Sequence, residues 1–227
     1  MADIKQHRRV NDILLGPLER PTLKWLAANM PAWVTPNICT SIGILGALGA
    51  GAGYLLSNYD KTFLWFASLG FILNWFGDSL DGTLARHRHI ERPIFGFFVD
   101  HTIDAFSAAV IFLCLGLTPY VDFRVACLTL IAYLLLCVLV FVRTSVVGEF
   151  KISYGMLGPT EIRVIAILLN IAMYFGGVQI FALRLGRVWQ ILLTPYDLAL
   201  ILIGLVLLAI FIVTGVRETI RLAKENK

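Results

Sequence analysis

Residues 78–104 read DSLDGTLARHRHIERPIFGFFVDHTID, and this stretch carries four aspartates within or beside long apolar segments. Asp78 and Asp81 are three residues apart, and Asp100 and Asp104 are four residues apart. On an α-helix, either spacing places both side chains on one face. A carboxylate in a membrane-spanning helix is costly, so it points to function by default. If the two helices pack side by side, we expect the four carboxylates to converge.

The predicted cluster offers only oxygen atoms as ligands. Mg²⁺ and Mn²⁺ are hard cations that prefer such ligands. A purely structural ion-pair cluster is the competing interpretation, but the nearby Arg86 and Arg88 are too few to neutralise four acids. The sequence therefore favours a site for one or two divalent ions.

The composition of the 227-residue chain is that of a membrane protein. Hydrophobic residues make up 58%, charged residues 15%, and the mean hydropathy is +0.79. Ordinary soluble domains have roughly 45–50% apolar and about 25% charged residues. The chain lacks the polar tracts, glycine periodicity and dense cysteines of disordered, collagen-like or disulfide-scaffold proteins.

We predict an all-α integral membrane protein with six transmembrane helices and an N-terminal amphipathic helix at the membrane interface. Residues 1–35 form the interfacial segment, in which Pro21 is expected to break the helix, and residues 36–227 form the transmembrane domain. Each predicted span has about the 20 residues that a bilayer requires. The six spans are 37–57, 62–82, 95–118, 124–147, 160–182 and 192–216.

Basic residues in the loops and near the ends of the spans predict the orientation. Fourteen Lys and Arg lie on the side of the termini and of the loops around 83–94 and 148–159, against four on the other side. The positive-inside rule makes the richer side cytoplasmic. The net charge of +4 therefore needs no nucleic-acid partner. The aspartates are expected at this cytoplasmic end.

The string Asp78-x2-Asp81-Gly82-x2-Ala85-Arg86-x9-Gly96-x3-Asp100-x3-Asp104 resembles the signature of the CDP-alcohol phosphotransferase family. The resemblance implies a six-helix core, a homodimer, and metal-binding aspartates that engage the pyrophosphate of a CDP-linked substrate. It also implies that the substrate is bordered by Gly82, Ala85 and Gly96 and that its phosphates are bound by Arg86. Pro36-Asn37-x2-Thr40 is a weaker similarity that would bring Asn37 and Thr40 to the nucleotide, although Pro-Asn is also an ordinary helix start.

Two residues are candidates for the general base. The family resemblance offers Asp104. The Asp100-His101 pair and the segment Gly158-Pro159-Thr160-Glu161 are similar to the choline/ethanolamine phosphotransferase branch, which suggests that Glu161 orients His101 as the base.

Each of these two residues also has a structural interpretation. His101 would be a buried histidine bonded to a backbone carbonyl, and Glu161 would be a first-turn acid that favours its helix N-terminus. Ile162 departs from the glycine usual after the Glu in eukaryotic members, so the acceptor or headgroup would differ.

Three functions follow as hypotheses. The first is an enzyme of phospholipid synthesis that transfers phosphocholine or phosphoethanolamine from its CDP ester to a diacylglycerol-type lipid and releases CMP. The second is a phosphatidyltransferase that uses CDP-diacylglycerol and a soluble alcohol, such as inositol phosphate, glycerol phosphate or serine, with Asp104 as base. Arg143, Lys151 and Arg163 are available to an anionic alcohol. The third is a cation transporter. We expect a prokaryotic cell membrane.

Overall fold

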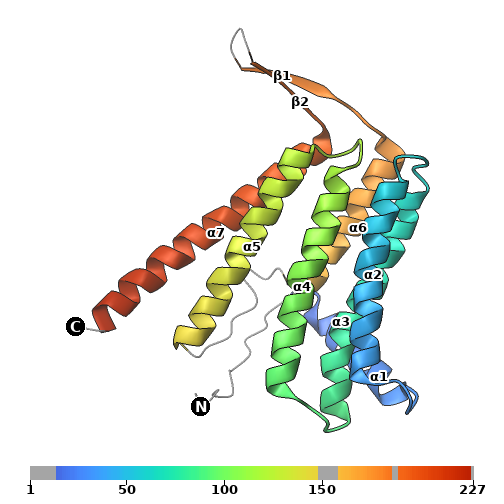
Figure 1. Ribbon diagram of the computed structural model, residues 1–227, viewed down its shortest axis with the longest axis vertical. Helices are drawn as coiled ribbons and strands as arrows, with labels where there is room; N and C mark the ends of the chain where they lie inside the picture. Colours follow the sequence, from blue (N-terminus) through green and yellow to red (C-terminus); the bar gives the residue numbers. More distant parts are fainter. Residues whose placement is uncertain (1–13, 148–157, 186–188, 226–227) are drawn as a thin grey trace.

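The computed structural model describes residues 14–147, 158–185 and 189–225. Residues 1–13 of the predicted interfacial segment and most of the loop 148–159 lie outside this part. The described residues form seven helices and one hairpin (Figure 1). The elements are α1 (Gly16–Asn29), α2 (Pro36–Leu56), α3 (Phe63–His87), α4 (Pro93–Gly116), α5 (Phe123–Val147), α6 (Pro159–Gly176), β1 (Phe181–Leu185), β2 (Trp189–Leu193) and α7 (Pro195–Glu225).

Among the described residues, five helices are long and apolar enough to cross a membrane: α2, α4, α5, α6 and α7. The second predicted span corresponds to α3, whose 25 residues extend about 37 Å. Asp78, Asp81 and Arg86 lie in the C-terminal half of α3 and lower its mean hydropathy. It packs along α2 over much of its length (Figure 1).

Two predicted helix boundaries were wrong. Pro21 lies inside α1 and does not break it, because Leu23 and Ala27 on the same helix are buried against α3 and hold the helix in place. The predicted span 160–182 ends six residues early, because Gly177 takes a φ of 65° and terminates α6.

Residues 181–182, assigned by the sequence to the end of the fifth span, and residues 192–193, assigned to the start of the sixth, belong instead to an antiparallel hairpin. Phe181 pairs with Leu193, and Leu185 pairs with Trp189. Consequently α7 begins at Pro195, and it continues to Glu225, nine residues beyond the predicted end of the last span.

Small residues bring α2 and α3 into backbone contact. A Cβ at Gly70 would lie 2.7 Å from the carbonyl oxygen of Gly46, and a Cβ at Gly77 would overlap the backbone of Gly43. Close approach through glycine is a common way for helices to pack in membranes, where no hydrophobic effect drives them together. The aspartate-bearing end of α3 therefore lies directly against the first turns of α2.

The remaining helices are joined by buried polar contacts. Tyr54 on α2 donates to Asn170 on α6 (2.8 Å), and Asn170 donates to Ser68 on α3 (3.1 Å). These three satisfy one another at the end of the bundle away from the aspartates. Further out, α5 and α7 pair and lean away from the other helices (Figure 1), with Arg143 bonded to Glu218 at 2.7 Å.

A buried aspartate fixes the start of α7. Asp197 accepts the backbone N–H of Thr194 and that of Asp122, both at 2.7 Å. Thr194 in turn accepts the N–H of Asp197, so the two residues form a reciprocal cap of the helix. This contact joins α7 to the connection between α4 and α5.

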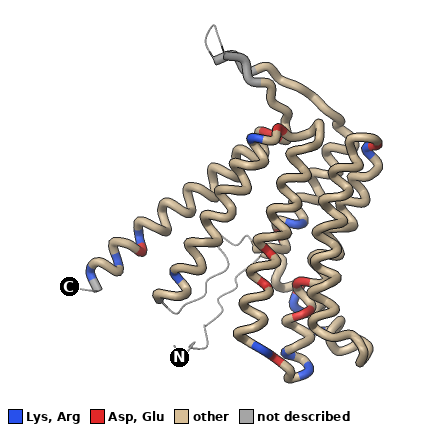
Figure 2. The backbone as a smooth tube through the Cα atoms, in the orientation of Figure 1, with Lys and Arg blue, Asp and Glu red and all other residues tan. Residues whose placement is uncertain are grey.

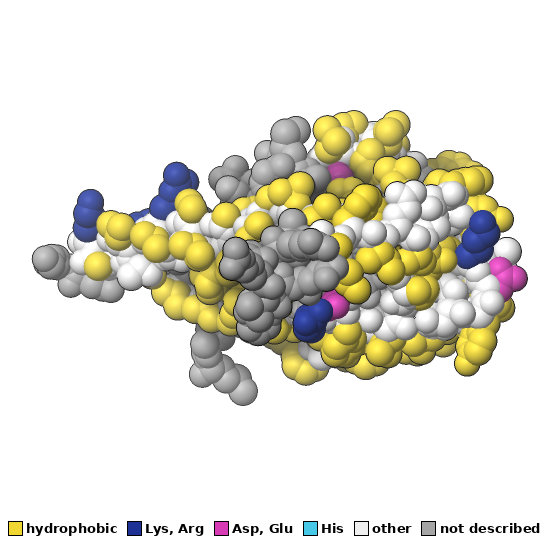
Figure 3. Space-filling view, turned by 90° about the horizontal axis from the view of Figure 1, so that it is seen from above, with side chains coloured by type: hydrophobic (Ala, Val, Ile, Leu, Met, Phe, Trp, Pro, Cys, Tyr) yellow, Lys and Arg dark blue, Asp and Glu magenta, His cyan; other side chains and the backbone are white. Residues whose placement is uncertain are grey.

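Charged residues gather towards the helix ends and around the lower half of α3 and α4 (Figure 2). Hydrophobic side chains cover much of the surface seen in Figure 3. An apolar outer surface on long helices is the expected arrangement for a protein surrounded by lipid. The fold is therefore that of an integral membrane protein.

Candidate active site

Three carboxylates meet between α3 and α4. Asp78, Asp100 and Asp104 each offer an oxygen, and these oxygens lie within 4.8 Å of one another. The helical spacing of four puts Asp100 and Asp104 on one face of α4, as predicted, and that face is turned towards Asp78. All-oxygen donors at this separation suit a hard divalent cation.

Asp81 lines the same cleft but points towards α2. Its Oδ2 accepts the hydroxyl of Thr40 at 2.7 Å, and its Oδ1 accepts the N–H of Gly82. The cleft is lined by Thr40, Gly43, Asn74, Asp78, Asp81, Asp100 and Ile103. The structure thus brings Thr40 to the aspartates, whereas Asn37 is exposed on the first turn of α2.

A buried arginine from α6 completes the acidic cluster. Nη2 of Arg163 donates to Oδ2 of Asp78 at 2.7 Å, and its Nε donates to Oδ1 of Asn74 at 2.8 Å. Asn74 also donates to the carbonyl of Gly43 at 2.9 Å, so α6, α3 and α2 are connected. Arg163 is only 9% exposed.

The sequence analysis missed Arg163 as a partner of the cluster, because 85 residues separate it from Asp78. The available signal was a charged residue inside a predicted span, which is as unusual for an arginine as for an aspartate.

The other residues of the signature are not among those that line the cleft. The guanidinium of Arg86 reaches the hydroxyl of Thr83 at 3.2 Å and passes beside Gly82, where an added Cβ would lie 3.3 Å from Nη1. Ala85 is half-buried on the same helix. Apart from its chain neighbours and the backbone of its own helix, no described heavy atom lies within 4 Å of a Cβ built at Gly96. A substrate could approach the backbone at Gly96.

His101 sits next to the cluster among aromatic rings. Its Nδ1 lies 2.8 Å from the carbonyl oxygen of Phe97 and 3.6 Å from Oδ2 of Asp100. The ring stacks on that of Phe97, with 4.2 Å between centroids, and meets the edge of Phe141 from α5 at 5.0 Å. The contact with a carbonyl assigns the proton to Nδ1 and fixes the ring orientation.

Glu161 makes different contacts from those that the resemblance suggested. Oε2 accepts the N–H of Gly158 at 2.9 Å, and Oε1 accepts the N–H of Leu15 at 2.7 Å. The residue is 4% exposed. Among the described hydrogen bonds, neither carboxylate oxygen reaches His101. Glu161 caps α6, as its alternative interpretation expected, and holds the start of α1.

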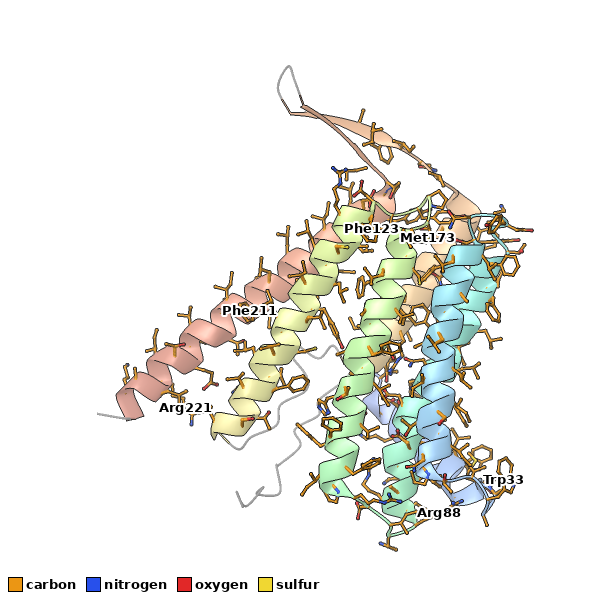
Figure 4. All side chains as sticks on the ribbon, viewed as in Figure 1. Trp33, Arg88, Phe123, Met173, Phe211 and Arg221 are labelled. Carbon is orange, nitrogen blue, oxygen red and sulfur yellow. The ribbon has the colours of Figure 1, made fainter. Side chains whose placement is uncertain are left out.

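Arg88 is a second residue whose contacts the sequence did not reveal. Its guanidinium donates to the carbonyl oxygens of Met30 (3.0 Å), Pro31 (2.9 Å) and Val34. Figure 4 shows Arg88 at the same end of the bundle as Trp33, which belongs to this α1–α2 connection. Arg88 therefore holds the segment that leads into the first turn of α2.

Comparison with known proteins supports the resemblance found in the sequence. The pattern of the family described as CDP-alcohol phosphatidyltransferase matches residues 33–213. An uncharacterized protein of Aquifex aeolicus is 31% identical over 182 residues, which cover 80% of this chain and 75% of that protein.

Two further relatives have names that state an activity. Cholinephosphotransferase 1 of Danio rerio is 24% identical over 172 residues, 70% of this chain and 43% of that protein. Phosphatidylinositol phosphate synthase of Cutibacterium acnes is 38% identical over 87 residues, 37% of this chain and 39% of that protein. The matched region is less than half of either relative. Because the family pattern covers most of the sequence, the chain belongs to the CDP-alcohol phosphatidyltransferase family.

Proposed function

We propose that this protein transfers phosphocholine or phosphoethanolamine from a CDP ester to the hydroxyl of a diacylglycerol-type lipid and releases CMP. The observation that carries the proposal is the group of three carboxylates, Asp78, Asp100 and Asp104, with their oxygens within 4.8 Å of one another beside His101. The similarity to a cholinephosphotransferase supports the choice of headgroup.

The family depends on divalent metal, and the aspartates fit that requirement by their oxygen chemistry. Asp78, Asp100 and Asp104 would hold Mg²⁺ or Mn²⁺, with Asp81 as a further ligand from the same cleft. The bound ion would neutralise the charge of the substrate phosphates and orient them.

The nucleotide would lie along the end of the site formed by the signature residues. Arg86 would donate to phosphate oxygens, for which a guanidinium is well suited. Gly82, Ala85 and Gly96 would border the nucleotide, and Asn37 would reach it from the first turn of α2. Thr40 would lie beside the nucleotide and hold the Asp81 carboxylate in place through its hydrogen bond.

The proposed chemical step is a displacement at the phosphorus that carries the headgroup. The lipid hydroxyl oxygen forms a bond to this phosphorus, the bond to the bridging oxygen of CMP breaks, and CMP leaves with the electron pair. His101 takes the hydroxyl proton as general base. Its orientation comes from the Phe97 carbonyl and the stacked ring, while Glu161 supports the site by holding the starts of α6 and α1.

A second candidate uses CDP-diacylglycerol as donor and a soluble alcohol as acceptor, with Asp104 as base. Two observations favour it. Nη1 of Arg163 is buried and has no hydrogen-bond partner among the described residues, so it could donate to an anionic alcohol although the guanidinium is paired with Asp78. A phosphatidylinositol phosphate synthase is also among the relatives.

We further propose that α3 spans the membrane together with the five apolar helices, giving six spans. Residues 1–35 would lie at the interface, and residues 36–227 would form the transmembrane domain of a homodimer in a prokaryotic cell membrane. The site and both termini would face the cytoplasm, where a soluble nucleotide and a bilayer lipid can meet. The excess of Lys and Arg at that end supports this orientation.

CMP release by purified protein in detergent tests the proposal. CDP-choline or CDP-ethanolamine with diacylglycerol is compared with CDP-diacylglycerol and a panel of alcohols, each with Mg²⁺ or Mn²⁺. Activity in the first set, lost in His101→Ala, is expected. Activity only in the second set would transfer the role of base to Asp104. Movement of divalent ions across liposomes without CMP release would instead indicate a transporter.

A further inference from the structure

A single carboxylate oxygen joins three helices beside the cluster. Oε1 of Glu19, on α1, accepts the indole N–H of Trp75 at 2.9 Å and the hydroxyl of Ser79 at 3.1 Å, both from α3. The same oxygen accepts the hydroxyl of Thr160, on α6, at 2.7 Å. Hydrogen bonds to a charged acceptor are stronger than those between neutral groups. Glu19 therefore links α6 to α3 through α1.

This link runs parallel to the one made by Arg163. On α3, the Glu19 partners Trp75 and Ser79 directly follow Asn74 and Asp78, the two residues that Arg163 binds. The pairs 74/78 and 75/79 each lie one turn apart, so they form adjacent faces of one helix. On α6, Arg163 lies one turn beyond the residue that binds Glu19.

The first turn of α6 has a second bond to α1. The N–H of Leu15 donates to Glu161 at 2.7 Å, while Glu161 also caps α6 through Gly158. Two hydrogen bonds therefore join α1 to the first turn of α6. Glu19 accepts one from α6, and the backbone N–H of Leu15, just before α1, donates the other. A helix that only rested on a membrane surface would need neither bond.

We propose that Glu19 is a positioning residue of the metal site. By fixing α6 against α3, it sets the place from which Arg163 reaches Asp78, and hence the position of the Asp78 carboxylate relative to Asp100 and Asp104. This role rests on the proposed function, because it treats these aspartates as metal ligands. Glu19 itself touches neither substrate nor metal.

The test is Mn²⁺ binding to the purified full chain in detergent, without nucleotide or lipid, followed by electron paramagnetic resonance. Glu19→Ala is expected to weaken binding about tenfold, the scale of loss when a group that orients a ligand is removed. Glu19→Gln keeps an acceptor oxygen but removes the charge, and it is expected to stay within about threefold of wild type. Glu91→Ala, an exposed acid between α3 and α4, is the matched control and should bind as wild type.

A second pair of variants isolates the bond to α6. Thr160→Ala removes one hydroxyl and is expected to reproduce most of the Glu19→Ala loss, whereas Thr160→Ser keeps the hydroxyl and should restore binding. This pair also decides the matter if Glu19→Ala does not fold. Wild-type Mn²⁺ affinity in Thr160→Ala, or an equal loss in Glu19→Gln and Glu19→Ala, would overturn the proposal.

The proposed function and the role of Glu19 fail in different ways. If wild type binds Mn²⁺ but releases no CMP from any donor, the enzymatic proposal fails while the variants still report on Glu19. If wild type does not bind Mn²⁺, the positioning role is refuted with it.

Discussion

Replacing Arg163 with Met tests how much the buried ion pair contributes to stability. The substitution removes the 2.7 Å bond to Asp78 and the 2.8 Å bond to Asn74 while keeping most of the apolar side-chain volume. Breaking a buried pair from one side costs ~3–5 kcal/mol, because the partner charge is left uncompensated. The Asp78 side chain keeps 20% exposure, so we expect the lower end, about 3 kcal/mol.

For a chain of this size, that loss corresponds to a fall in melting temperature of about 6–12 °C. Thermal unfolding of the purified protein in detergent and chelator measures it, since the chelator keeps metal from replacing the arginine charge. Arg124→Met is the matched control, because Arg124 pairs with Asp122 at 2.8 Å but is 79% exposed. Water screens an exposed ion pair, so this variant should melt near wild type.

The double variant Asp78→Asn/Arg163→Met separates charge from packing. It removes the uncompensated carboxylate and should recover part of the lost stability. The buried pair does not hold α6 to α3 as described if Arg163→Met melts within about 2 °C of wild type, or if its melting temperature falls no further than that of Arg124→Met.

Three further predictions address other contacts of the bundle. Arg88→Ala removes the donors that hold the α1–α2 connection, which should lower the stability by about 1.5–3 kcal/mol. It should also raise the KM for the CDP-linked substrate more than it lowers kcat. An unchanged KM in the CMP assay would refute this role. Asp197→Ala leaves the buried N–H of Thr194 and the partly buried N–H of Asp122 unsatisfied and should cost about 2–4 kcal/mol in thermal unfolding, with CMP release at 25 °C retained. Gly77→Ala should lower the stability by about 1–3 kcal/mol, because the new methyl group overlaps the α2 backbone. The control Gly49→Ala has open space around the new methyl group and should melt as wild type. Equal melting temperatures of the two variants would contradict the close packing of α2 and α3.

The aspartate cluster shows what local spacing can predict. Asp100 and Asp104 share a face because they are one helical turn apart on one element, and the sequence states that spacing directly. The direction of Asp81 depends on Thr40, 41 residues away, and so on how α2 lies against α3. Spacing alone could place Asp81 near the site, but it could not distinguish a carboxylate turned towards α2 from one turned towards the cluster.

His101 and Glu161 show that similarity between motifs does not predict which residues are in contact. The similarity suggested a pair, whereas the hydrogen bonds of Glu161 go to Gly158 and to Leu15 at the start of α1. The cap at Gly158 is local and was one of the two interpretations of Glu161. The bond to Leu15 requires α1 to lie over the start of α6, which no pattern within either segment encodes.

The hairpin after α6 has a related cause. Residues 178–185 are largely apolar, and composition does not distinguish an extended apolar segment from the end of a membrane span. The left-handed backbone of Gly177 makes that distinction in the structure.

By itself, the sequence determined that the chain is a helical membrane protein, where most of its long helices lie, and which aspartates share a face, because apolar length and helical periodicity are properties of contiguous residues. Only the tertiary structure decided that Arg163 binds Asp78 and that Glu19 joins α3 to α6. Arg163 and Asp78 are 85 positions apart in the sequence, and Thr160 and Glu19 are 141 positions apart. Such contacts depend on which helix faces meet, and in lipid that choice is made by close packing and by hydrogen bonds between polar groups that have no water to bind.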